Sequence, residues 1–92
     1  MATIFDMAID HFWRAQQAAM NSNQLDCLGQ MANGLQLFCG AVKGSNPDRA
    51  FDMAIDHFWR SQQAGMRGNQ SELLLQMSTG LQQFCAATKD SI

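Results

Sequence analysis

Basic residues are scarce in this sequence. Its 92 residues include six Lys and Arg against eight Asp and Glu, which gives a formal net charge of −2. Binding to nucleic acid needs clustered Lys and Arg, because these side chains neutralise the phosphates of the backbone. The composition therefore disfavours nucleic acid as a partner.

Long apolar runs are missing too, although apolar residues make up 47% of the chain. A membrane-spanning helix needs a run of about 18 or more apolar residues. The stretch from Met1 to Asp6 has neither the basic segment nor the apolar core of a signal peptide. Three cysteines, an odd number, without a Cys-x-x-Cys motif favour reduced thiols. We therefore expect a cytoplasmic protein with no membrane partner.

Catalytic signatures are equally sparse. The sequence has no nucleophile motif and no glycine-rich phosphate loop, and its seven glycines stand singly. Cys39 and Cys85 lie among apolar residues at helical spacing, where a small buried thiol is the usual case. We therefore expect a non-enzymatic protein that needs no cofactor, with both of these cysteines in the core.

What the chain does contain is an internal repeat. The ten residues FDMAIDHFWR at 5–14 return unchanged at 51–60, an offset of 46 residues. Over this offset, 26 of the 40 positions from 5 to 44 match those from 51 to 90. Self-similarity at such a period indicates repeated structural units. We expect one domain over residues 1–92, with a first repeat at about 3–44, a linker at 44–48 and a second repeat at about 49–90.

Each copy has the pattern of two helices. Apolar side chains recur at helical spacing over 4–20 and 24–43, and again over 47–66 and 70–89. Residues suited to begin or end these helices stand at their boundaries, and they are the candidate N-caps Thr3, Asn23, Asn46 and Asn69, Pro47 at a first helical position, and Gly44 and Gly68 at helix ends.

No alternating strand pattern competes with these helices. The sequence therefore predicts an all-α four-helix bundle built from two tandem-duplicated antiparallel helical hairpins. An open pair of hairpins that a second chain completes is the alternative arrangement.

The helical projection also predicts which residues are buried. The apolar arc of the first helix holds Phe5, Ala8, Ile9, Phe12, Trp13, Ala15, Ala19 and Met20, and the opposite side holds Asp6, Met7, Asp10, His11, Arg14, Gln17 and Ala18. The equivalent glycines Gly34 and Gly80 fall within helices, where Gly costs about 1 kcal/mol relative to Ala. Such a cost suggests that another helix approaches closely at each glycine.

The outer side of the first helix recurs in the third. Core packing does not require these residues, so their recurrence favours a functional face. The candidate partner-binding residues are Met7, His11, Trp13 and Arg14 in the first copy and Met53, His57, Trp59 and Arg60 in the second. We expect a small helical protein-protein interaction module that presents this duplicated face to a protein partner or to itself, as an inhibitor, a chaperone or an assembly subunit does.

A metal- or cofactor-binding bundle that uses His11 and His57 is the alternative function. Di-metal helical bundles bind through Glu-x-x-His spacings that project inward. Here both histidines fall on the polar side of their helices, and equivalent positions on the first and third helices of an up-down bundle point apart. We therefore predict no metal site within one chain.

Overall fold

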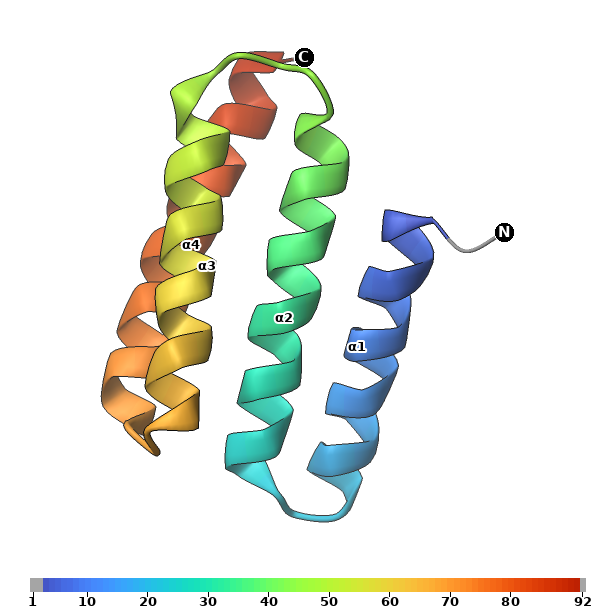
Figure 1. The fold of residues 1–92 in the computed structure, drawn as a ribbon. Coiled ribbons are helices and arrows are strands. Elements are labelled where there is room, and N and C mark those ends of the chain that lie inside the picture. Colours follow the sequence, from blue (N-terminus) through green and yellow to red (C-terminus); the bar gives the residue numbers. More distant parts are fainter. Residues whose placement is uncertain (1–2, 92) are drawn as a thin grey trace.

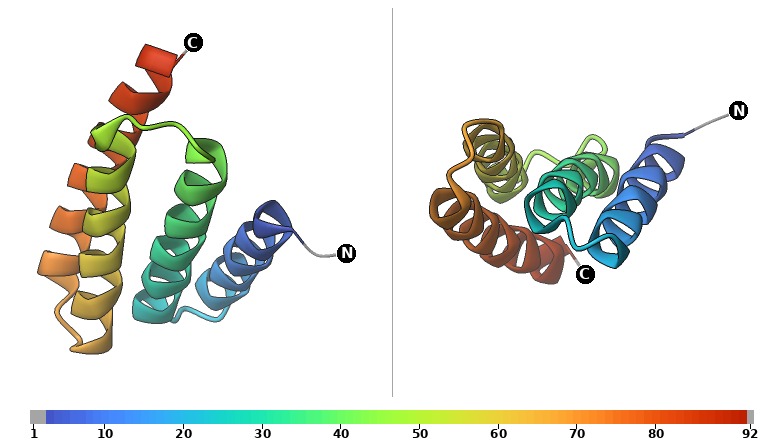
Figure 2. Two further views of the ribbon diagram at one scale, coloured as in Figure 1. Left: turned by 45° about the horizontal axis from the view of Figure 1, so that its top comes forward. Right: turned by 90° about the horizontal axis from the view of Figure 1, so that it is seen from below.

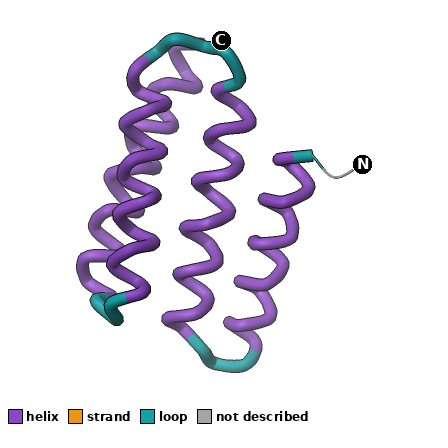
Figure 3. Tube along the Cα trace, in the orientation of Figure 1, coloured by secondary structure: helices purple, strands orange, loops and turns teal. Residues whose placement is uncertain are grey.

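The computed structural model describes residues 3–91, and over this range the chain forms four α-helices and no strand. The helices are α1 (Ile4–Met20), α2 (Gln24–Lys43), α3 (Arg49–Met66) and α4 (Gln70–Ser91). Short loops join them, as Figures 1 and 3 show. The prediction of an all-α fold with four helices is confirmed.

Side chains that cap the first turn fix the positions at which the helices begin. Thr3 and Asp6 form a reciprocal capping box at the start of α1, in which Thr3 Oγ1 accepts from Asp6 N at 3.1 Å. Asn23 Oδ1 accepts from Asp26 N at 3.1 Å, and Asn69 Oδ1 accepts from Glu72 N, also at 3.1 Å. These caps satisfy amide groups that a first helical turn leaves without partners, so sequence alone located these helix starts.

The start of α3 differs from the prediction. The helix begins at Arg49 rather than Pro47, and its N-cap is Asp48, whose Oδ1 accepts from Ala50 N at 2.9 Å. Asn46, the predicted cap, instead accepts from Asp48 N at 2.9 Å and holds the linker in shape. Both residue types are good caps, and here the linker conformation selects the second.

Equivalent turns in the two hairpins carry different residues at the same backbone conformation. Ser22 has φ 60° between α1 and α2, and its counterpart Gly68 has φ 73° between α3 and α4. A side chain in this left-handed region clashes with the backbone, whereas Gly adopts it without strain.

We therefore expect Ser22→Gly to raise the free energy of unfolding by about 0.5–1 kcal/mol. This value is the backbone strain that Gly relieves in the folded protein, less the stabilisation of the unfolded chain by the greater conformational freedom of Gly. The reciprocal Gly68→Ser should lower it by a similar amount. Urea denaturation followed by circular dichroism measures both. A stability loss in Ser22→Gly would contradict this interpretation.

The helices pack as two antiparallel hairpins joined through α2. Helix α1 packs on α2, α3 packs on α4, and α2 packs on α3 and more lightly on α4. These contacts fit a bundle, but α1 contacts α2 alone among the described helices. Figure 2 shows α1 on the far side of α2 from α3 and α4. The bundle is therefore open along one side of α1.

The core lies between α2, α3 and α4. Its buried residues are Ala32, Cys39, Phe51, Ala54, Phe58, Ala64, Leu73, Met77, Phe84 and Ala87, and Leu28, Met31, Leu35, Ala50 and Ile55 pack against them. Several of these residues are aromatic. The ring of Phe84 meets the rings of Phe38, Phe51 and Phe58 edge-on, a geometry that aromatic pairs favour.

The buried side of α1 overlaps the predicted side only in part, at Ala8 and Ala15. Its buried residues are Ala8, Ala15 and Ala18, although the projection placed Ala18 on the solvent side. The large apolar residues of the predicted arc are instead exposed, at Phe5, Ile9, Trp13 and Met20. The small side chains face α2 because they let the two helix backbones come close together.

The repeat-equivalent glycines Gly34 and Gly80 lie where the two helices of each hairpin pack closely. A Cβ added at Gly34 would lie 2.7 Å from Cε1 of Phe12, and one added at Gly80 would lie 2.7 Å from Cε1 of Phe58. In each hairpin a phenylalanine ring therefore occupies the space that a side chain would need. The predicted close helix approach is confirmed at both positions.

Candidate interaction surface

The exposed residues of the candidate face have nearly the same environment in both copies. Met7 is 48% exposed and Met53 45%, while Trp13 is 58% exposed and Trp59 49%. The projection placed Trp13 on the apolar arc of its helix, whereas both tryptophans are exposed in the structure. The repeat therefore preserves the exposure of these side chains as well as their identity.

Each copy of the face carries one ion pair along its helix. Arg14 Nε lies 3.0 Å from Asp10 Oδ2, and Arg60 Nε lies 3.0 Å from Asp56 Oδ2. An exposed pair at this spacing stabilises a helix by only about 0.3–0.5 kcal/mol. Its larger effect is to hold the guanidinium groups in the same place on α1 and α3.

The two histidines have a structural role that the sequence interpretation missed. Nδ1 of His11 lies 2.8 Å from Oε1 of Gln30, and Nδ1 of His57 lies 2.7 Å from Oε1 of Gln76. An amide oxygen only accepts, so each ring donates from Nδ1. Both histidines are half-buried between the helices of their own hairpin rather than on the solvent side. The sequence did contain a signal for these hydrogen bonds, because Gln30 and Gln76 also stand at equivalent positions of the repeat.

The histidines do not come together in the described structure. They lie on α1 and α3, which do not contact each other. Within residues 3–91, no group of three or more His, Cys, Asp and Glu side chains is arranged to hold a metal ion. The same range contains no helix that is long and apolar enough to cross a membrane.

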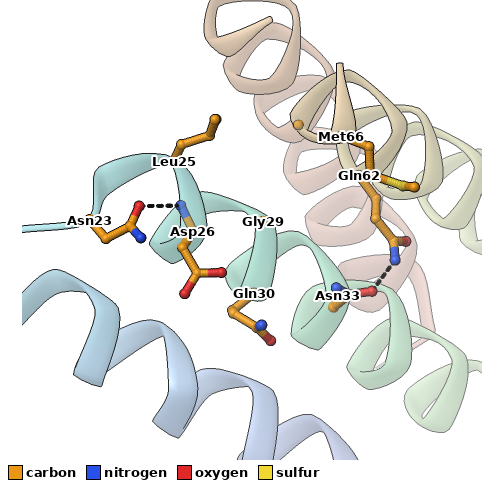
Figure 4. Close-up of a pocket in the computed structure, with 9 residues that line it drawn as sticks. Asn23, Leu25, Asp26, Gly29, Gln30, Asn33, Gln62 and Met66 are labelled. Carbon is orange, nitrogen blue, oxygen red and sulfur yellow. Dashed lines mark hydrogen bonds between the residues drawn. The ribbon is translucent and has the colours of Figure 1, made fainter. Parts of the chain in front are cut away.

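Shallow hollows mark the surface beside these residues. One of about 310 Å³ lies on α1 and is lined by Asp6, Met7, Asp10, His11 and Arg14. Another of about 430 Å³ lies between α2 and α3, where Gln62 Nε2 donates to Asn33 Oδ1 (Figure 4). An apolar groove of about 600 Å³ lies between α2 and α4 and includes Phe38, Leu81 and Cys85.

The two equivalent cysteines have opposite environments. Cys39 is fully buried and Cys85 is exposed, so the prediction that both lie in the core is wrong for Cys85. Burial, together with the negative charge of Asp52, raises the pKa of the Cys39 thiol to about 11 against the opposing effect of Lys43. The Cys39 thiol is therefore protonated at neutral pH.

We expect a thiol reagent near pH 8 to modify Cys85 first, Cys27 more slowly and Cys39 only on unfolding, because the thiolate is the reactive species. Mass spectrometry of a time course, with each single Cys→Ser variant assigning its peak, measures the order. Modification of Cys39 in the folded protein at the rate of Cys85 would contradict the structure.

No protein-family model, curated protein or solved structure matches this chain. The case for a function therefore depends on the surface itself and on its recurrence within the chain.

Proposed function

We propose that this protein is a non-enzymatic cytoplasmic interaction module that presents one face twice to a protein partner. The face consists of Met7, Trp13 and Arg14 on α1 and of Met53, Trp59 and Arg60 on α3. The observation that carries the proposal is the matched exposure and ion pairing of these residues in two copies. His11 and His57, which the sequence placed on the same face, have a structural role instead. Their hydrogen bonds hold α1 to α2 and α3 to α4, and so help to fix the position of the face.

The residue types suit recognition of a protein. Trp and Arg are enriched among the residues that dominate binding energies, and a flexible Met side chain adapts to varied apolar surfaces. Two copies on one chain allow bivalent binding, in which the second contact forms at a high effective concentration. A partner with two equivalent sites, or a symmetric dimer, fits this arrangement.

We further infer that the two hairpins arose by tandem duplication of a two-helix segment. The match of 26 positions in 40 supports this origin. Equivalent contacts support it independently, since the His–Gln hydrogen bonds, the Asp–Arg ion pairs and the Gly–Phe contacts each occur once in each hairpin. The His–Gln and Gly–Phe contacts join two helices and do not follow from helix formation alone, whereas the Asp–Arg pairs at i, i+4 lie within one helix.

Affinity capture from the native host with separate variants of each face tests the function. One variant carries Met7→Ser and Arg14→Ala, a second carries Met53→Ser and Arg60→Ala, and a third carries all four changes. We expect each single-face variant to bind a captured partner at least about 100-fold more weakly, through lost avidity, and the fourfold variant to lose it.

A matched control uses the same chemistry outside the face. Leu75 is 59% exposed and Lys89 is exposed, and both lie on α4, which carries no residue of the face, so Leu75→Ser with Lys89→Ala should capture the partner as the natural protein does. A partner retained by the fourfold variant would overturn the proposal. Both tryptophans belong to the face, so a change in intrinsic fluorescence on binding provides a second measurement.

A further inference from the structure

Helix α2 covers one side of α3 through a specific set of contacts. Cys39 Sγ donates to the carbonyl oxygen of Phe51 at 3.8 Å, and Lys43 Nζ lies 2.5 Å from Asp52 Oδ1. This contact joins the second helix of one repeat to the first helix of the next. It is therefore a template for stacking one repeat on another.

The side of α2 used in this stacking recurs on α4 without a cover. On α2 it consists of Leu28, Ala32, Leu35 and Cys39, and the α4 stripe, as we name it, consists of the equivalent Leu74, Ser78, Leu81 and Cys85. Ala32 and Cys39 are fully buried, whereas Leu74 is 41% exposed, Leu81 is 42% exposed and Ser78 and Cys85 are exposed. Three of these four pairs are identical residues.

The side of α3 that receives α2 also recurs without a cover, on α1. The α1 stripe consists of Phe5, Ile9 and Gln16, which are identical to Phe51, Ile55 and Gln62. Phe51 is 1% exposed but Phe5 is 48% exposed, and Ile9 is 63% exposed although Ile55 packs against the core. Helices α1 and α4 therefore each expose a surface that is equivalent to one of the two surfaces buried in the α2–α3 contact.

We propose that the α4 stripe of one copy packs on the α1 stripe of the next copy, so that the α2–α3 contact is repeated across the chain boundary. The two surfaces differ, so the contact is heterologous and propagates head to tail instead of closing as a two-fold dimer. Met7 and Arg14 of the outer face lie on the opposite side of α1 from this stripe, whereas Trp13 follows Ile9 by one helical turn and borders it.

Charge supports the pairing of these two surfaces. The ion pair between Lys43 and Asp52 has the equivalents Lys89 on α4 and Asp6 on α1. Lys89 and Asp6 are exposed and carry opposite charges, so stacking in the same register brings them together.

The residues that differ between the two repeats also fit. Gly29 and Gly40 of α2 correspond to Leu75 and Ala86 of α4. A Cβ added at Gly29 or at Gly40 meets nothing within 4 Å, so the first side-chain atom of Leu75 or Ala86 has room at the equivalent position of the template. The uncovered stripes are apolar, whereas the end units of stable repeat arrays carry polar outer faces.

Two blocking variants test the proposal. Ile9→Glu places a charge in the α1 stripe, and Ser78→Glu places one in the α4 stripe, and both residues are exposed in the single chain. We expect the natural protein to show a mass that rises with concentration beyond that of a dimer in light scattering, and each variant to remain monomeric. Mixing the two variants should give a one-to-one complex and nothing larger, because one intact stripe remains on each chain.

Controls separate this result from misfolding and from the outer face. Met7→Glu adds the same charge to α1 off the stripe, at 48% exposure, so it should assemble as the natural protein does while losing a partner of the outer face. Circular dichroism confirms that each variant is helical. A natural protein that stays monomeric at the highest attainable concentration, or that stops at a dimer, overturns the proposal. So does a mixture of the two variants that remains monomeric.

Cys85 provides a readout that needs no change in the α4 stripe. In the stacked copies Cys85 takes the buried place of Cys39. Its rate of modification by a thiol reagent should fall at least about 10-fold as protein concentration rises, and the fall should be absent in Ile9→Glu. An equal fall in the Cys85 modification rate in Ile9→Glu would show that Cys85 is protected by some contact other than stacking on the α1 stripe, and it would contradict the proposal.

Discussion

Replacing Phe51 with Ala is expected to lower the free energy of unfolding by about 3–5 kcal/mol, the usual cost of deleting a buried aromatic ring. Phe51 is 1% exposed and belongs to the central core cluster, where its ring lies 6.3 Å from that of Phe84. A domain of this size is stable by only about 5–14 kcal/mol. The substitution therefore removes a large share of the total stability.

The same change at Phe5 is expected to cost only about 1 kcal/mol, the surface term for a half-exposed ring. Phe5 is 48% exposed and has an edge-on contact with Phe38 at 6.2 Å. Residues 5–14 and 51–60 are identical, so local helix propensity cancels in the comparison. The difference between the two losses measures the tertiary environment alone.

Urea denaturation followed by circular dichroism, in the Ser78→Glu background to keep the chain monomeric, measures both losses. If Phe51→Ala does not fold, the milder pair Phe51→Leu and Phe5→Leu gives the same contrast on a smaller scale. Equal losses at the two positions would mean that α1 is covered within its own chain as α3 is, which contradicts the observed arrangement.

The helices were predictable because their boundaries depend on local chemistry. Thr3 and Asn23 begin helices whose first turns they cap, and Gly68 ends one in the left-handed conformation that Gly tolerates. The one displaced start, at Asp48 instead of Asn46, lies where two good caps stand two residues apart. No local rule decides between them.

The packing direction of α1 was not predictable in the same way. The nine residues that follow Phe5 are the same as those that follow Phe51, yet one phenylalanine is half-exposed and the other buried. Within the described residues, α3 packs against both α2 and α4, whereas α1 packs against α2 alone, so Phe5 has an edge-on contact with Phe38 of α2 but no second helix covers it. A helical projection identifies an apolar stripe, but it cannot tell whether another helix is available to cover it.

The candidate face was predicted in part. Exposure of Met7 and Arg14 followed from their positions on the projection, whereas Trp13 was placed on the apolar arc and is exposed. His11 was misplaced because the true axis of contact with α2 runs through the alanines, about one residue position away from the centre of the large apolar side chains. Reading Gln30 as its repeated partner would have identified the hydrogen bond.

Replacing Gly80 with Ala is expected to lower the free energy of unfolding by about 1–3 kcal/mol, the usual cost of overpacking a core. The direction is opposite to the ordinary effect, since Gly→Ala within a helix normally stabilises by about 1 kcal/mol. The reason is the 2.7 Å distance from the new Cβ to Cε1 of Phe58, a ring that is 0% exposed and enclosed by the core.

Three matched variants make the test specific to this contact. Gly40→Ala adds the same methyl group to α2 where nothing lies within 4 Å, so it should stabilise by about 0.5–1 kcal/mol. Gly34→Ala should cost less than Gly80→Ala, because the facing ring of Phe12 is only half-buried and can shift outward. Adding Phe58→Leu to Gly80→Ala should give a loss smaller than the sum of the two single losses, because the pair are in contact. The contrary result is that Gly80→Ala stabilises the protein as much as Gly40→Ala does. That result would show that the Phe58 ring does not occupy this space, and it would contradict the close packing of α3 on α4.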